Sequence, residues 1–155
     1  MSDTLELHED VEVANELKFV RFQLGDEHFA FSVDSVTGII KWREVTPLPN
    51  VEDHLLGLGN LRGRTLPVTD LRLKMGIESP VVKEDGLVIV TEDNHNSVGL
   101  LVDHVIEVLT VNENDIQENT VDISNDIQGY VTGIVNVKDV LISILDLEKL
   151  VEVAA

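Results

Sequence analysis

Apolar and polar residues alternate along much of the chain after Lys18, with the period of two that is typical of β-strands. In the first half this pattern predicts five strands, at 19–24, 29–33, 36–45, 58–61 and 65–69. The turn Gly25-Asp26-Glu27-His28 joins the first two. Pro47 ends the third, because proline cannot donate a hydrogen bond to a neighbouring strand. One helical turn is predicted at 51–56.

The second half repeats this order of elements. It predicts strands at 87–90, 98–102, 105–111, 130–137 and 140–145, with a polar stretch at 112–128. A helix is predicted over 145–153, because Leu147, Leu150 and Val151 fall on one face and Asp146 is a suitable N-cap. Many short strands joined by turns favour an all-β fold of barrel type over alternating strands and helices.

Comparison of the chain with itself indicates an internal duplication. At an offset of 76 residues, 57–71 aligns with 133–147 without a gap, and the Gly, Asn, Asp and Leu at 57, 60, 70 and 71 recur. At an offset of 69, 31–36 aligns with 100–105, so the second half contains a seven-residue insertion between 109 and 133. Two offsets in consistent order predict a duplicated β unit, whose copies meet along a seam where a groove can form.

Composition narrows the class of protein. The chain has 155 residues, 43% of them hydrophobic, which is enough for one domain with a core. Its 29 acidic and 11 basic residues give a net charge of −18, which repels phosphate backbones and argues against a nucleic-acid partner. The absence of a long apolar run and of a leader argues against membrane insertion and secretion. With no cysteine, we expect a cytoplasmic protein without disulfides.

The charge is distributed unevenly. Residues 1–17 contain six acids and no base, and are predicted to be an acidic flexible tail before a domain at 18–155. Residues 84–155 contain fifteen acids and two lysines, whereas 41–74 carries a net charge of +2. The basic stretch is either a chance feature of a soluble surface or a face for an acidic protein partner.

No pattern of residues indicates catalysis. The five histidines form no HExxH motif, and the chain lacks a P-loop, a GxGxxG, a GxSxG and a calcium loop. Asp34 and Asp103 occupy equivalent positions of the repeat and could form a carboxylate pair, although aspartates that cap turns are far commoner. We therefore expect no catalytic residue, no metal site and no cofactor.

Two features favour binding to a partner. The segment 57–64 places glycines and arginines around an apolar strand, so Gly63 forms a tight turn and Arg62 either decorates it or binds a partner carboxylate. The base at 62 recurs as Lys138 in the repeat, which slightly favours the functional interpretation. Trp42, between Lys41 and Arg43, is either a half-buried strand residue or an interface anchor.

Several blocks of the chain resemble the CheW-like coupling proteins of bacterial chemotaxis. They are 22–27, 45–49, 57–63, 67–72, 98–105 and 144–150, and the resemblance extends over about 18–151. The most specific block runs from Asn60-Leu61-Arg62-Gly63 to Asp70-Leu71-Arg72. The resemblance implies two intertwined, five-stranded, SH3-like β-barrels with a short C-terminal helix. We expect one barrel at roughly 18–82 with part of the C-terminus, and the other at 83–145.

The resemblance also implies a function. It is that of a non-catalytic adaptor between the cytoplasmic tips of methyl-accepting chemoreceptors and the regulatory domain of a CheA-type histidine kinase, recruited to membrane-associated receptor arrays. The receptor-binding residues would be Val36, Ile39, Gly57, Asn60, Arg62, Leu87 and Val105. The kinase-binding residues would be Gly99, Gln117 and Asp122. Gly38 departs from the glutamate of many relatives.

Two alternatives remain open from the sequence. The adaptor could serve a non-flagellar array, such as one for twitching motility or biofilm control, or the chain could be a small ligand-binding β-barrel. On the adaptor hypothesis, Arg62→Ala and Gly57→Asp are both expected to weaken receptor binding without unfolding the domain.

Overall fold

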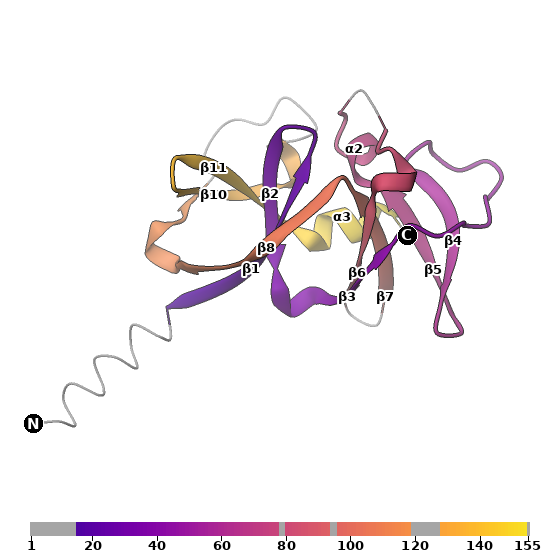
Figure 1. Cartoon of the computed structure of the whole chain (residues 1–155), viewed down its shortest axis with the longest axis horizontal. Coiled ribbons are helices and arrows are strands. Elements are labelled where there is room, and N and C mark those ends of the chain that lie inside the picture. The colour runs from indigo at the N-terminus through magenta and orange to yellow at the C-terminus, as the bar shows by residue number, and fades with distance from the viewer. Residues whose placement is uncertain (1–14, 78–79, 94–95, 119–127, 155) are drawn as a thin grey trace, which may run out of the picture.

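The computed structural model describes residues 15–77, 80–93, 96–118 and 128–154. Over these ranges the chain is mostly β-structure in two sheets, with the short helices α2 (Leu71–Lys74) and α3 (Leu147–Ala154) (Figure 1). The predicted all-β class is therefore confirmed. No helix in the described ranges is long and apolar enough to cross a membrane.

The first sheet has six strands and contains both ends of the domain. Its order is β8 (His104–Asn112), β1 (Glu16–Leu24), β2 (Glu27–Ser32), β11 (Val140–Leu145), β10 (Val131–Val137) and β9 (Gln117–Glu118). All neighbours are antiparallel except β2 and β11. The chain passes from one edge to the other through a 3-10 turn at Glu113–Asp115, which closes the sheet into a barrel, called barrel A below.

The second sheet has five strands from the middle of the chain. Its order is β3 (Val36–Lys41), β6 (Leu87–Asp93), β7 (Asn96–Val102), β5 (Arg64–Asp70) and β4 (Leu55–Leu61), with β5 and β7 parallel. The backbones of Thr46 and Leu58 exchange hydrogen bonds of 2.9 and 2.8 Å. Because Thr46 follows β3 and Leu58 lies on β4, this bridge closes the sheet into barrel B.

The two barrels are intertwined, because the chain crosses between them twice. It leaves barrel A after β2, through a 3-10 turn at Val33–Ser35, and returns after β7 at Asp103. The sheets therefore do not follow the expected division into 18–82 and 83–145. The hairpin β1–β2 pairs with strands of the second half, and the hairpin β6–β7 pairs with strands of the first half.

The backbone bears out the internal duplication in detail. At the offset of 69, the β-bulge at Thr37 in β3 corresponds to the bulge at Ile106 in β8. At the offset of 76, the bulge at Leu56 in β4 corresponds to the one at Thr132 in β10. Bulges are specific local features, so their recurrence at matching positions identifies two copies of one β unit.

Three hydrophobic clusters hold the domain together. One lies inside each barrel, and the largest lies between the barrels; it is called the seam core below. The seam core includes Phe22, Phe29 and Phe31 from the hairpin β1–β2, which pack against Ile89 and Leu100 of the hairpin β6–β7. Leu147 and Leu150 of α3 complete it, and Figure 1 shows this helix between the barrels.

Several boundaries differ from the sequence prediction. The third strand ends at Lys41 rather than at 45, and 51–56 is not helical, because Leu55 already begins β4. β1 begins at Glu16, so the last residues of the expected tail belong to the sheet, while 1–14 lie outside the described residues. Barrel A has six strands rather than five, because 117–118 adds the short β9.

Helix α2 was not predicted, although its capping residues are visible in the sequence. Asp70 accepts the N–H of Leu73 at 3.2 Å as N-cap. After the helix, Gly76 adopts φ +81°, while the N–H of Ile77 bonds to the carbonyl of Arg72. This is the Schellman arrangement that ends many helices. At the equivalent Asp146, the carboxylate accepts the N–H of Lys149 at 3.4 Å, as expected for the N-cap of α3.

A substitution in the seam core should destabilise the whole domain. Leu100 is fully buried there, so Leu100→Ala is expected to lower the free energy of unfolding by about 3 kcal/mol. Because the seam core joins both barrels, unfolding by urea should remain a single transition. Leu141→Ala is the matched control: Leu141 is 64% exposed, and its loss should change the stability by less than about 0.5 kcal/mol. Two separate transitions would contradict this account of the seam.

Candidate partner-binding surface

Two rows of apolar side chains border the seam core, one from each barrel. Val36 and Leu87 of barrel B and Val105 of barrel A are partly buried against it. Further along the strands, Ile39 is 43% exposed and Val108 is 57% exposed. Ile39 lies opposite Ile89, and Val108 lies opposite Val20; both partners belong to the seam core, so the rows continue from that core toward solvent.

The repeat relates the two rows to each other. At the offset of 69, Val36 corresponds to Val105 and Ile39 corresponds to Val108. Val108 was missed in the sequence analysis, because an apolar residue in a strand is ordinarily buried. The repeat could have identified it as the counterpart of Ile39. The structure thus assembles an apolar border from four predicted residues, Val36, Ile39, Leu87 and Val105, and adds Val108.

A groove of about 520 Å³ lies on barrel B and is lined by residues from all five of its strands. Of the predicted residues, Ile39 and Arg62 line it. Arg64 lies beside Arg62, and Glu92 is the single acid among the lining residues that the structure describes. The groove therefore combines an apolar wall with a positive rim, in a chain whose net charge is −18.

The turn that presents Arg62 has a demanding geometry. Arg62 and Gly63 have φ of +51° and +79°, which defines a two-residue type I′ hairpin turn. The side chain of Asn60 accepts the N–H of Gly63 at 3.1 Å and so stabilises the turn. Asn60 is thus a structural support of the loop that carries Arg62, even though its side chain is exposed.

The same turn occurs in barrel A. Lys138 and Asp139 have φ of +50° and +68°, and Asn136 accepts the N–H of Asp139 at 3.0 Å. The base that recurs in the repeat therefore belongs to both hairpins, and only the one at Arg62 lies beside the groove. The recurrence of the base therefore does not by itself show which of the two turns belongs to a binding surface.

Gly57 is buried and packs against the segment that closes barrel B. Its φ is +148°, and an added Cβ would press on the carbonyl of Thr46 and lie 3.0 Å from the Cα of Pro47. Both neighbours are backbone atoms of the segment that closes barrel B, so they cannot move aside cheaply. The expectation that Gly57→Asp leaves the fold intact is therefore wrong, because the aspartate side chain has no room.

The three residues predicted to contact the kinase have different surroundings. Gly99 is buried inside barrel B, where an added Cβ would lie 2.8 Å from a methyl group of Val88. Gln117 is exposed on β9, at the edge of barrel A. Asp122 lies outside the described residues. Of the three, only Gln117 is seen to present a side chain at the surface.

Trp42 and the two repeat-related aspartates each have a local structural role. The Trp42 side chain is partly buried against the barrel B core, and Lys83 Nζ lies 5.6 Å from its ring centre, as in a cation–π contact. Asp103 pairs with Arg72 at 3.2 Å. Asp34 lies in an exposed 3-10 turn, whose N–H bonds to Ser32 Oγ. The Asp103 carboxylate is thus paired with Arg72, and the two aspartates form no carboxylate pair.

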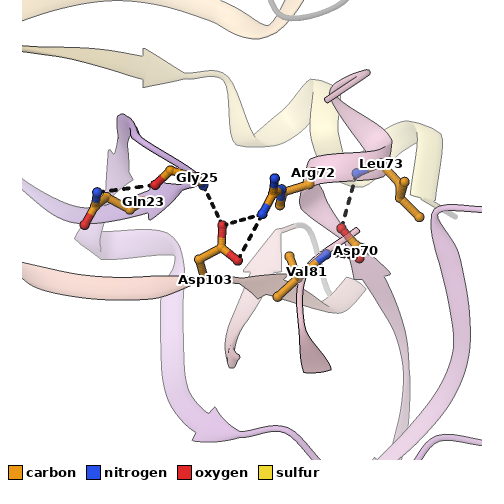
Figure 2. Close-up of polar contacts among 7 residues, drawn as sticks. All are labelled: Gln23, Gly25, Asp70, Arg72, Leu73, Val81 and Asp103. Carbon is orange, nitrogen blue, oxygen red and sulfur yellow. Dashed lines mark hydrogen bonds and ion pairs between the residues drawn. The ribbon is translucent and has the colours of Figure 1, made fainter. Parts of the chain in front are cut away.

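Ionisable groups are buried near α2. The carboxylate of Asp70 is fully buried, and burial raises its pKa, although the N–H groups of Val81 and Leu73 oppose this by bonding to it (Figure 2). Burial also lowers the pKa of Lys74, whose Nζ lies 6.0 Å from the ring centre of Tyr130. Burial, and then Lys74, lower the pKa of His54. Among the described residues, no three histidine or acidic side chains are grouped as metal ligands would be.

Comparison with known proteins gives consistent matches. The profile of the CheW-like domain matches residues 18–155. Chemotaxis protein CheW of Rhizobium meliloti is 32% identical over 132 residues, which is 84% of this chain and 84% of that protein. Protein PilI of Pseudomonas aeruginosa is 31% identical over 86 residues, 56% of this chain and 48% of that protein.

A solved structure has the same fold. The crystal structure of the scaffolding protein TtCheW from Thermoanaerobacter tengcongensis matches with a TM-score of 0.77 at 31% sequence identity, over 84% of each chain. The expected fold of two intertwined barrels is thus confirmed by the topology and by this likeness.

Gly57 and Gly38 allow a matched test of the surface geometry. Gly57→Ala is expected to lower the free energy of unfolding by about 3 kcal/mol or more, because its Cβ meets backbone at a φ that alanine disfavours. Gly38→Ala, on β3, should change the free energy of unfolding by less than about 0.5 kcal/mol, since no atom lies within 4 Å of the added Cβ. Urea denaturation measures both; equal losses would refute the geometry described for Gly57.

Proposed function

The chain belongs to the family of CheW-like domains, and on that basis we propose that it is a non-catalytic adaptor in bacterial chemotaxis that couples chemoreceptor tips to a CheA-type histidine kinase. The observation that carries the proposal is the family match over 18–155, combined with a surface suited to gripping a helix. The matching crystal structure is that of a scaffolding protein, which agrees with an adaptor.

We assign the receptor side to the two apolar rows and the positive rim. A receptor tip of helical form has an apolar stripe along one face, and such a stripe can pack against exposed side chains like Ile39 and Val108. Val36, Leu87 and Val105 would form the floor, because they are half-covered by the seam core. Gly57 and Asn60 would act indirectly, by shaping the loops beside them.

The charges favour a partner with acidic groups next to that stripe. Arg62 and Arg64 line the groove, and Glu92 is the single acid among its described lining residues. An arginine can bind a carboxylate or a backbone oxygen with two donors. Over the rest of the surface, excess negative charge repels other acidic proteins, so attraction is concentrated at the groove.

We place the kinase side at the ends of the barrels, around Gly99 and 112–128. Gln117 would make a direct contact, because it is exposed on β9 at an edge of barrel A. Gly99 would instead keep the interior of barrel B compact, because it is buried. Asp122 remains a predicted contact outside the described residues. Binding both partners in one geometry lets a shift in the receptor change kinase activity through differential affinity.

A second candidate is an adaptor of the same fold in a non-flagellar array. The partial match to PilI favours it, but that match covers less of the chain than the match to chemotaxis protein CheW. Isolation of the protein from its native cells, followed by identification of the bound kinase and receptors, distinguishes the two candidates.

Direct binding tests the proposed function. The purified chain is expected to form a complex with a receptor-tip fragment and with the regulatory domain of a CheA-type kinase, and to bridge the two when all three are mixed. Size-exclusion chromatography and calorimetry measure this. Absence of binding to either fragment would refute the proposal for this chain.

Arg62→Asn separates the charge from the turn. Asn-Gly is the preferred pair for a type I′ turn, so the substitution should raise the free energy of unfolding by up to about 1 kcal/mol. Loss of the guanidinium should weaken binding of the receptor tip about fivefold, as for an exposed ion pair worth up to about 1 kcal/mol.

The matched control for this variant is Lys138→Asn. It removes a base from the equivalent turn of barrel A and should leave receptor binding unchanged. Circular dichroism and calorimetry measure stability and affinity. An equal loss of affinity in both variants would show that net charge, and not the Arg62 side chain at the groove, controls binding.

A further inference from the structure

One carboxylate, that of Asp103, contacts both barrels at the second crossover of the chain. Asp103, between β7 and β8, accepts the N–H of Gly25 from the β1–β2 turn of barrel A at 2.5 Å. The same carboxylate pairs with Arg72 of α2, which follows β5 of barrel B, at 3.2 Å. Figure 2 shows Asp103 between these two groups. We call Gly25, Arg72 and Asp103 the inter-barrel tie.

The tie has the properties of a strong contact. The side chains of Arg72 and Asp103 are only 19% and 14% exposed, so solvent screens the pair weakly. Hydrogen bonds to an ionised group are stronger than those between neutral groups. The backbone of Asp103 also donates to the carbonyl of Gln23 at 3.2 Å, which fixes the crossover against the same turn of barrel A.

Arg72 is committed to this contact. The capped helix α2 orients it, and its Nε is buried with no hydrogen-bond partner. Its Nη1 bonds to both oxygens of Asp103, at 3.2 and 3.5 Å. Nη2 would lie 3.8 Å from a Cβ placed on Gly25, so the guanidinium lies against the turn of barrel A. Asp103 is therefore the acid that pairs directly with this cation, and the buried Asp70 adds a further electrostatic attraction.

The repeat shows that the tie is one-sided. By the offsets of 69 and 76, Asp103 corresponds to Asp34 and Arg72 corresponds to Glu148. Asp34 and Glu148 are both acidic and both exposed, so they cannot form the same ion pair at the first crossover. Among the described residues, the first crossover thus has no counterpart of this ion pair. The orientation between the barrels depends on the tie together with the seam core and the contact of Lys74 with the Tyr130 ring.

The position of the tie links it to the candidate receptor surface. Val105 comes two residues after Asp103 and begins the apolar row of barrel A, whereas Val36 and Leu87 belong to the row of barrel B. We propose that the pair Arg72–Asp103 fixes the spacing of the two rows and so acts as a positioning pair for receptor binding. This inference rests on the proposed function for its second half only; the first half concerns the chain alone.

The distance between the two barrels can be measured in the isolated protein, without a partner. Because the chain has no cysteine, Val82→Cys in barrel B and Leu141→Cys in barrel A give two unique sites for spin labels. Both side chains are exposed, and Val82 follows Val81 of the barrel B core. Pulsed electron–electron double resonance measures the distance between the two labels. The labelled parent should give one narrow distribution of this distance, and Arg72→Met and Asp103→Asn should each give a broader or shifted one.

A double variant guards against simple unfolding. Each single variant leaves a buried charge unpaired, whereas Arg72→Met/Asp103→Asn removes both charges and should fold more readily. Its distance distribution should still be broader than that of the parent. Glu107→Gln is the matched control: it breaks the ion pair with Arg21, which lies within barrel A, at 2.9 Å, and should leave the distribution unchanged.

Receptor binding tests the second half of the proposal in the same proteins without labels. The double variant should bind a receptor-tip fragment at least about fivefold more weakly, in the range of typical coupling between sites. The single variants should be non-additive with it in a double-mutant cycle, and Glu107→Gln should bind like the parent.

Each outcome has a defined meaning. An unchanged distance distribution in the double variant would overturn the tie, whatever the receptor does. A broadened distribution with parental affinity would overturn the positioning role. If the parent itself does not bind a receptor tip, the proposed function fails, and the distance measurement still decides whether the tie sets the orientation of the barrels.

Discussion

The structure depends on the burial of two hairpins against each other. β1–β2 and β6–β7 each carry apolar side chains on both faces, one set inside a barrel and the other in the seam core. If either hairpin exposed its seam face to water, several aromatic and branched side chains would lose their burial and the free energy it contributes. The barrels are therefore stable as a pair, and every surface feature is positioned relative to this shared core.

Duplication explains why a binding surface forms beside the seam. A repeated unit that buries one face against its copy leaves the margins of that face half-covered, as at Val36 and Val105. The copies then diverged at equivalent sites. Arg62 lies beside a groove while Lys138 does not, and Arg72 has an acid partner while Glu148 lies where a second base would be needed. The duplicated unit thus provides the common fold of the two barrels, and the residues that differ between the copies give each barrel its own contacts.

Much of the candidate site could be predicted from the sequence, but the roles of its residues could not. Of the seven residues predicted for receptor binding, only Ile39 and Arg62 line the groove, which lies on barrel B. Gly57 and Asn60 instead support loops, through close backbone packing and a turn hydrogen bond. A family motif includes both the residues that contact a partner and the residues that support the contacting loops, since substitution of either kind can abolish binding. The backbone atoms packed around Gly57 show that this residue supports a loop and is not itself free to contact a partner.

The sequence by itself determined the strands other than the short β9, the duplication and the turn at Gly63, because alternation and turn chemistry are local. It did not determine which strands share a barrel: pairing β1–β2 with β8 and β11 depends on contacts far apart in the chain. Nor did it identify α2, which is too short for a periodic signal, or join Asp103 to Arg72 and Gly25. Those contacts exist only once the hairpins are packed, because burial in three dimensions decides which polar groups meet.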